Sequence, residues 1–142
     1  MAFGDAAMSL HSAIGIAILT SMLSLFLGAL GVATRQEPGI TVHSLEYFNG
    51  IVRQERTVIA GGKTFFAKWD ARVETGNGLE IVCIGSGSHD YVEGYKTISM
   101  GVKDWTGDSE CDLSDGDYRL IATWHWGNSH TTHKSAIFTV KN

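Results

Sequence analysis

Three histidines lie close together near the C-terminal end, in the stretch WHWGNSHTTH. Neutral imidazole is a good ligand for zinc and copper, so three imidazoles around one turn are candidate ligands for a divalent metal. The spacing matches no named metal motif, and a polar surface loop that binds no metal is the alternative. We therefore treat His125, His130 and His133 as candidate binding residues and candidate metal ligands, in a chain for which we otherwise expect no cofactor.

An acidic stretch, DWTGDSECDLSDGD at residues 104–117, carries six carboxylates and no basic residue. Calcium prefers several carboxylate and carbonyl oxygens, so the composition raises the question of a calcium site. The helix-loop-helix calcium pattern requires glycine at its sixth position, and here that position is Leu113. The sequence favours a solvated loop held by a disulfide over a calcium site.

The chain contains two cysteines, Cys83 and Cys111. If their domain lies outside the cytoplasm, they are expected to form a disulfide; in the cytoplasm they are expected to be reduced thiols. The sequence contains no nucleophile elbow, glycine-rich phosphate loop or metalloprotease motif. We therefore predict that the protein is not an enzyme and that the cysteines are structural.

Tryptophan is the remaining side chain of interest for binding. Trp105 stands between Asp104 and a Thr-Gly turn, where we expect it to be exposed, and exposed tryptophans often mark a contact surface. Trp124 and Trp126 are expected to be mostly core residues. The sequence thus predicts a binding role for Trp105 or for the loop at residues 127–134.

Strands with one buried face are predicted to position these residues. In TFFAKWDARVE the odd positions from Phe65 to Val73 are apolar or aromatic, and most even positions are charged. Such period-two alternation is typical of a half-buried antiparallel strand. DYRLIATWHW repeats it, and shorter runs with glycine-containing turns between them bring the expected number to about seven. We predict a mainly β fold, an antiparallel β-sandwich.

One motif makes this prediction more specific. LSDGDYRLIA places Leu113, Gly116 and Tyr118 in the order L-x-x-G-x-Y before a strand, which resembles the tyrosine corner of immunoglobulin-like and fibronectin-like domains. The resemblance implies an immunoglobulin-like sandwich over residues 40–142, in which the Tyr118 hydroxyl bonds back to the backbone. Antibody-type domains have a cysteine two residues after this tyrosine, and here that position is Leu120.

The N-terminal part of the sequence is apolar. Residues 6–34 contain no Asp, Glu, Lys or Arg, and a helix over residues 13–33 would span about 31 Å, the thickness of a bilayer core. We predict a short N-terminal segment (1–12), a transmembrane helix (13–33), a linker (34–39) and a β-domain (40–142). A cleaved signal peptide is the alternative, although the start lacks a positive charge and the apolar run is long for a signal.

Small residues recur along the predicted helix and would let another helix approach closely within the lipid. These candidate helix-packing residues are Ala13, Ala17, Ser21, Ser24 and Gly28. The flanking charges are too few to set the orientation. The cysteine pair and the resemblance place the C-terminal domain outside the cytoplasm, in the periplasm or at the cell exterior. The expected partners are the lipid bilayer and the helices or subunits of a membrane complex. The net charge of −4, with basic residues scattered singly, indicates no nucleic-acid partner.

Three functions fit these features. The first is a non-catalytic, single-span membrane protein whose β-sandwich is an interaction or structural subunit of a larger membrane complex. The second is a filament or virion subunit, because an apolar helix before a β-domain also resembles archaeal pilins and archaellins, although Gly4 lacks the basic residue that precedes their processing site. The third is a secreted module that binds carbohydrate or protein after signal cleavage.

Overall fold

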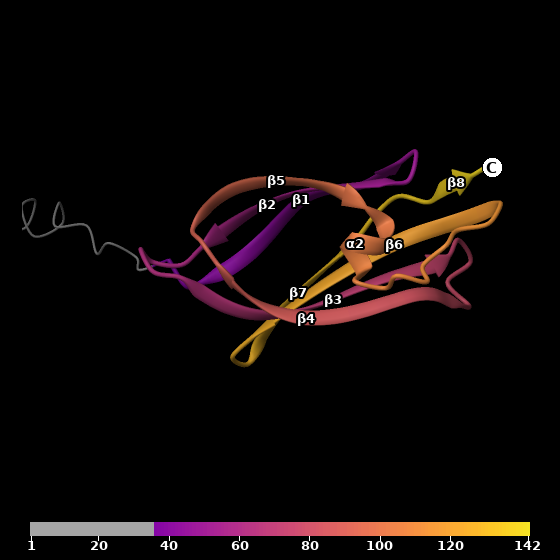
Figure 1. Ribbon diagram of the computed structural model, residues 1–142. Coiled ribbons are helices and arrows are strands. Elements are labelled where there is room, and N and C mark those ends of the chain that lie inside the picture. The colour runs from indigo at the N-terminus through magenta and orange to yellow at the C-terminus, as the bar shows by residue number, and fades with distance from the viewer. Residues whose placement is uncertain (1–35) are drawn as a thin grey trace, which may run out of the picture. The chain divides into compact units, whose positions relative to one another are not determined.

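A computed structural model describes residues 36–142 of the chain (Figure 1). Within this range the chain forms eight strands and one short helix. In chain order they are β1 (Gly39–Phe48), β2 (Ile51–Ile59), β3 (Phe65–Thr75), β4 (Ile81–Tyr91), β5 (Gly94–Gly101), α2 (Val102–Thr106), β6 (Gly116–Trp126), β7 (Ser129–Lys134) and β8 (Phe138–Val140).

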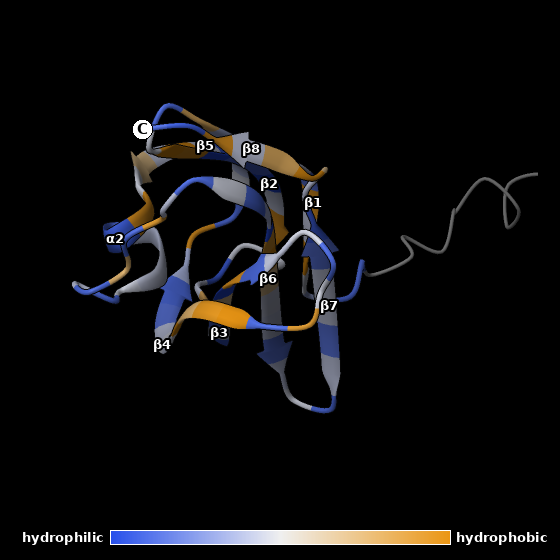
Figure 2. Cartoon of the chain, turned by 90° about the vertical axis from the view of Figure 1, so that its right-hand side faces the viewer, coloured by the Kyte–Doolittle hydropathy of each residue, from blue (hydrophilic) through white to orange (hydrophobic). Residues whose placement is uncertain are grey.

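The strands form two antiparallel sheets that face each other across one apolar core (Figure 2). One sheet has the order β1-β2-β5; the other has the order β4-β3-β6-β7, with β8 paired to β6 beyond the end of β7. β4 and β5 are the open edges on one side, and α2 lies beside them in contact with strands of both sheets. The predicted β-sandwich is thus confirmed at the level of its two layers.

Alternation of side chains explains why these strands pair as they do. On β3, Phe65, Ala67, Ala71 and Val73 are buried, and Trp69 packs against them, as the sequence pattern predicts. The inward positions of β6 follow the same rule from Tyr118 to Trp124. A shift of register by one residue would turn these apolar sets to the solvent, so the hydrophobic pattern fixes the pairing of β3 with β6.

The structure has one strand more than the seven expected, because residues 129–134 form β7 and not a loop. Gly127 and Asn128 separate β6 from β7, and such a two-residue Gly-Asn link is typical of a β-hairpin. Strand β7 ends at Lys134, and the strand pairing is interrupted at Ser135. The Oγ atom of Ser135 accepts a hydrogen bond from the amide of Leu120 at 3.0 Å. β8 continues along β6 beyond this break.

The sandwich has two ends with different turns (Figure 1). We call the end that holds the β1–β2 turn, the β3–β4 turn, α2 and the C-terminus the distal end. The proximal end holds Gln36 and the turns that join β2 to β3, β4 to β5 and β6 to β7. β1 runs the length of the sandwich, about 33 Å for its ten residues, and so separates Gln36 from the distal end.

The predicted transmembrane helix at residues 13–33, with its stripe of small residues, lies outside the described residues. Among residues 36–142, no helix has the length and apolar character needed to span a bilayer.

Candidate functional site

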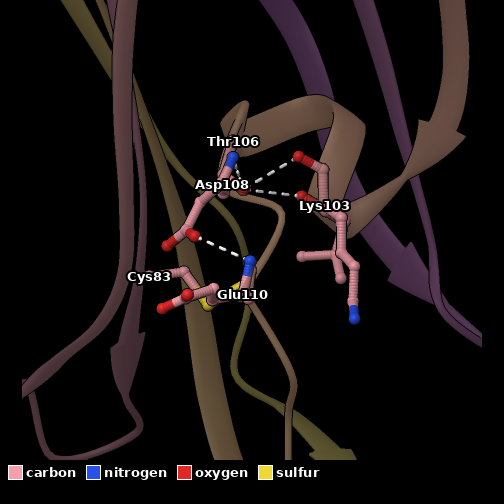
Figure 3. Close-up of a disulfide and its surroundings, with 7 residues drawn as sticks. Cys83, Lys103, Thr106, Asp108 and Glu110 are labelled. Atoms are coloured by element: carbon pink, nitrogen blue, oxygen red, sulfur yellow. Dashed lines mark hydrogen bonds between the residues drawn. A yellow bond between two sulfur atoms is a disulfide. The ribbon is translucent and has the colours of Figure 1, made fainter.

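Hydrogen bonds to its own backbone amides and a disulfide hold the acidic segment in place (Figure 3). Cys83 and Cys111 form a disulfide, which ties β4 to the segment between α2 and β6. Asp108 Oδ1 accepts a hydrogen bond from the amide of Glu110 at 3.0 Å, and the Asp108 carbonyl accepts one from the amide of Cys111 at 3.1 Å. These bonds give Asp108 a local structural role at a turn, so its position does not indicate calcium.

Helix α2 packs against β4 at a position that only glycine allows. A Cβ atom at Gly85 would lie 1.5 Å from the carbonyl oxygen of Thr106, so the two backbones come into direct contact there. Thr106 is fully buried, and its hydroxyl donates to the Val102 carbonyl at 2.9 Å. This contact and the disulfide hold α2 beside the open edges of both sheets.

The geometry of a tyrosine corner is present at the start of β6. The Tyr118 hydroxyl donates to the carbonyl oxygen of Ser114, four residues upstream, at 3.0 Å. The Phe138 ring lies between two tyrosines, 4.3 Å from the Tyr47 ring centre and 6.1 Å from that of Tyr118. This aromatic group joins the edge strand β1 to β6 and β8 at the distal end.

The three candidate histidines do not converge, and that part of the sequence interpretation is wrong. His125 and His130 lie opposite each other on β6 and β7, with ring centres 5.9 Å apart, and His125 pairs with Asp70 at 3.1 Å. His133 is three residues from His130 on the same strand, so its side chain points to the other face of the sheet. Among residues 36–142 no three His, Cys, Asp or Glu side chains are placed to hold a metal ion.

Trp105 is buried, with 7% of its surface exposed, which corrects the expectation of an exposed tryptophan. It lies on α2, and its Nε1 donates to Gln54 Oε1 on β2 at 3.3 Å. Because α2 closes over the core, the helix turns Trp105 inward, although the residues before and after it in the sequence are polar. A binding role for Trp105 remains a prediction, and it would require a cavity inside the sandwich.

The surface groups with perturbed pKa values lie on the outer face of the three-stranded sheet. A hydrogen bond from the Tyr95 hydroxyl lowers the pKa of Glu55 and raises the pKa of Tyr95 itself. Tyr95 is exposed and Glu55 is partly exposed on this outer face, so this is a surface pair and not an acid–base pair in a cleft.

An apolar surface at the distal end combines exposed apolar side chains with a groove. Phe48, Ile51 and Ile137 are 76%, 45% and 50% exposed, and all three border a groove of about 650 Å³ beside β1. Tyr47 and Phe138 lie at the same groove. We call these five residues the distal apolar surface. Single exposed apolar side chains are ordinary, whereas a group of them along a groove marks a contact site.

Sequence reasoning missed this surface, although a signal for it was present. Phe48 and Ile51 flank Asn49 and Gly50, which both have positive φ, 49° and 82°, as a tight hairpin turn requires. The two apolar residues are cross-strand partners on the outer face of the three-stranded sheet, where solvated strands normally carry polar side chains.

No protein-family model matches the chain, and no curated protein matches it in sequence. We therefore infer function from the geometry of residues 36–142 and from the composition of the N-terminal segment.

Proposed function

We propose that the chain is a non-catalytic interaction subunit of a membrane complex. In this proposal the N-terminal apolar segment anchors it, its immunoglobulin-like sandwich lies outside the cytoplasm, and the distal apolar surface binds another protein subunit. The observation that carries the proposal is the group of exposed apolar side chains around Phe48 at the distal end.

Two observations support the immunoglobulin-like assignment. The Tyr118 hydroxyl bonds to the backbone upstream of β6, as in a tyrosine corner, and the sheets divide the strands as β1-β2-β5 and β4-β3-β6-β7. Antibody constant domains place the fourth strand in the sheet of the first two, whereas here β4 pairs with β3. Variable domains also extend the sheet of the third strand, so the arrangement lies within the range of such sandwiches.

The disulfide supports a location outside the cytoplasm. Both Cys83 and Cys111 are 2% exposed, and structural disulfides persist in oxidising compartments. Alkylation of intact cells with a membrane-permeant maleimide tests this placement. We expect no labelling of either cysteine before reduction; labelling without reduction would contradict a location outside the cytoplasm.

The position of the distal apolar surface suits a tethered module. Gln36, where the sandwich begins, lies at the proximal end, so Phe48 is presented at the opposite end of the domain (Figure 1). Protein interfaces are centred on large apolar and aromatic side chains with a polar rim. Glu46 and Arg53 border the same groove and provide charged groups at its margin.

The test uses the full-length chain, extracted from its native membrane in a mild nonionic detergent. We expect a partner subunit to co-purify with the natural chain and to be lost with the double variant Phe48→Ser, Ile137→Ser. Phe66→Ser is the matched control, because Phe66 is 58% exposed on the outer face of the other sheet. We expect this control to keep the partner.

Two results would contradict the proposal. The first is a monomeric chain with no partner in mild detergent. The second is an equal loss of partner in Phe66→Ser and in the double variant, since the distal apolar surface would then have no special role. If the only partner is another copy of the chain, in ordered filaments or particles, the filament or virion function replaces this one.

A further inference from the structure

A cavity of about 260 Å³ lies between the two sheets, beside α2 and the open edges formed by β4 and β5. Its apolar wall consists of Trp105, Trp124, Ile98 and Met100. The volume is slightly below the range typical of drug-sized ligands, so the cavity suits a small molecule with a ring or a short apolar body. It shares no residue with the distal apolar surface.

The polar lining of this cavity includes a cation without a counter-ion. Arg56 points inward from β2, between the buried residues Gln54 and Val58, and its guanidinium carbon lies 4.8 Å from the centre of the Tyr91 ring. The two ion pairs found among residues 36–142 involve other side chains, so no carboxylate within 4.0 Å neutralises Arg56. Desolvation of an unpaired charge is unfavourable.

A second cation stands next to the first. Lys96 on β5 is the direct cross-strand partner of Arg56, so both side chains leave the sheet on the same face. Like charges at opposite positions of a strand pair repel each other. Lys96 is exposed and does not itself line the cavity. An anion bound at Arg56 would weaken this repulsion and supply the missing counter-ion of Arg56.

The neutral groups nearby are hydrogen-bond donors. Gln54 is 2% exposed, and its Oε1 accepts a hydrogen bond from Trp105. Its amide nitrogen Nε2 has no hydrogen-bond partner among the described residues. The oxygen of the Tyr91 hydroxyl accepts from Trp124 Nε1 at 3.0 Å, which leaves its proton to donate. Burial raises the pKa of Tyr91, so its hydroxyl keeps the proton. Burial lowers the pKa of Arg56, but a guanidinium group remains charged.

We propose that this cavity binds a small organic carboxylate with an apolar body. The carboxylate lies at Arg56 and accepts hydrogen bonds from Gln54 and Tyr91, because guanidinium and carboxylate groups match in plane and charge. The apolar body lies against Trp105 and Met100.

The other charged groups at the cavity are compatible with this orientation. Asp104 is an exposed residue of α2 next to Trp105, and it therefore lies at the end of the cavity that receives the apolar body. The Asp70 side chain belongs to the outer face of β3, where it pairs with His125. His89 lies on β4 with its ring 5.2 Å from that of Tyr91 and carries no carboxylate to the cavity.

The test is calorimetric titration of the full-length chain, in a nonionic detergent at constant ionic strength, with benzoate and with benzamide as its neutral analogue. We expect saturable binding of benzoate at least about tenfold tighter than that of benzamide. Arg56→Met is expected to lower the benzoate affinity to that for benzamide. Lys68→Met is the matched control, because Lys68 is exposed on the outer face of β3 and lines neither this cavity nor the groove of the distal apolar surface, and it should leave the benzoate affinity unchanged.

Three outcomes would overturn the proposal. They are the absence of saturable binding by both probes, equal affinity for benzoate and benzamide, and an equal loss of benzoate affinity in Lys68→Met and Arg56→Met. If Arg56→Met does not fold, Lys96→Met takes its place, with an expected threefold or greater loss for benzoate and no change for benzamide. The cavity and the distal apolar surface share no residue. We therefore expect Arg56→Met to keep the partner subunit, and the double variant Phe48→Ser, Ile137→Ser to keep its affinity for benzoate.

Discussion

Removal of the disulfide has an effect that can be worked out from the structure. The bridge closes a loop with a sequence separation of 28 residues, and the chain-entropy relation then gives about 12 cal/mol/K, or about 3.6 kcal/mol at 25 °C. We expect the double variant Cys83→Ala, Cys111→Ala to lose at least this free energy of unfolding, since both side chains are buried and their removal also leaves small cavities. For a domain of this size the loss corresponds to a fall in Tm of roughly 15–20 °C.

The assay is urea unfolding followed by tryptophan fluorescence. All four tryptophans lie in the sandwich, so the signal reports its unfolding and not the state of the N-terminal segment. The single variant Cys83→Ala is the control, because it breaks the same bridge and should lose nearly as much as the double variant. A loss below about 1 kcal/mol would refute the reasoning, since the bridge would then constrain the unfolded chain far less than its loop length implies.

Two further predictions concern backbone contacts at the distal end. Gly85→Ala is expected to destabilise the domain by about 3 kcal/mol or more, because the added Cβ would meet the backbone of Thr106. Gly101→Ala is the control, because Gly101 has a φ of −58° and a Cβ there would make only ordinary contacts. It should change the free energy of unfolding by less than about 1 kcal/mol in the same urea assay. Equal effects of the two variants would contradict the close approach of α2. Tyr118→Phe is expected to lose about 1 kcal/mol through its missing bond to Ser114, measured by thermal unfolding, and unchanged stability would show that the bond contributes nothing.

The parts of the fold that the sequence predicted are those where one physical rule is decisive. In β3 the buried positions alternate with more exposed ones, so the strand, its buried face and its register all follow from the same pattern. The inward positions of β6 follow it too, although Ile121 and Thr123 on the opposite face of that strand are also buried. The disulfide could be predicted conditionally, because the chain has two cysteines and their pairing depended only on the compartment.

The parts that the sequence missed depend on contacts between distant segments. β7 is polar on both faces and pairs along the edge of β6, so it carries no apolar alternation, and only the Gly-Asn turn before it indicates a hairpin. Trp105 is buried because α2 packs onto Gly85, which lies 20 positions away in the sequence. Three histidines close in sequence are candidates for one site, but the period of a strand separates His133 from the other two.

The inner face of β2 shows where the apolar pattern itself fails. Val52 and Val58 follow the rule, whereas Gln54 and Arg56 between them place an amide and a charge toward the core. A sequence specifies a fold best when every local choice agrees with it, and departures from that agreement concentrate at functional sites. These two departures are consecutive inward positions, and both line the cavity beside α2. An apolar pair would have filled that space, so the polar pair is better explained by a ligand than by stability of the sandwich.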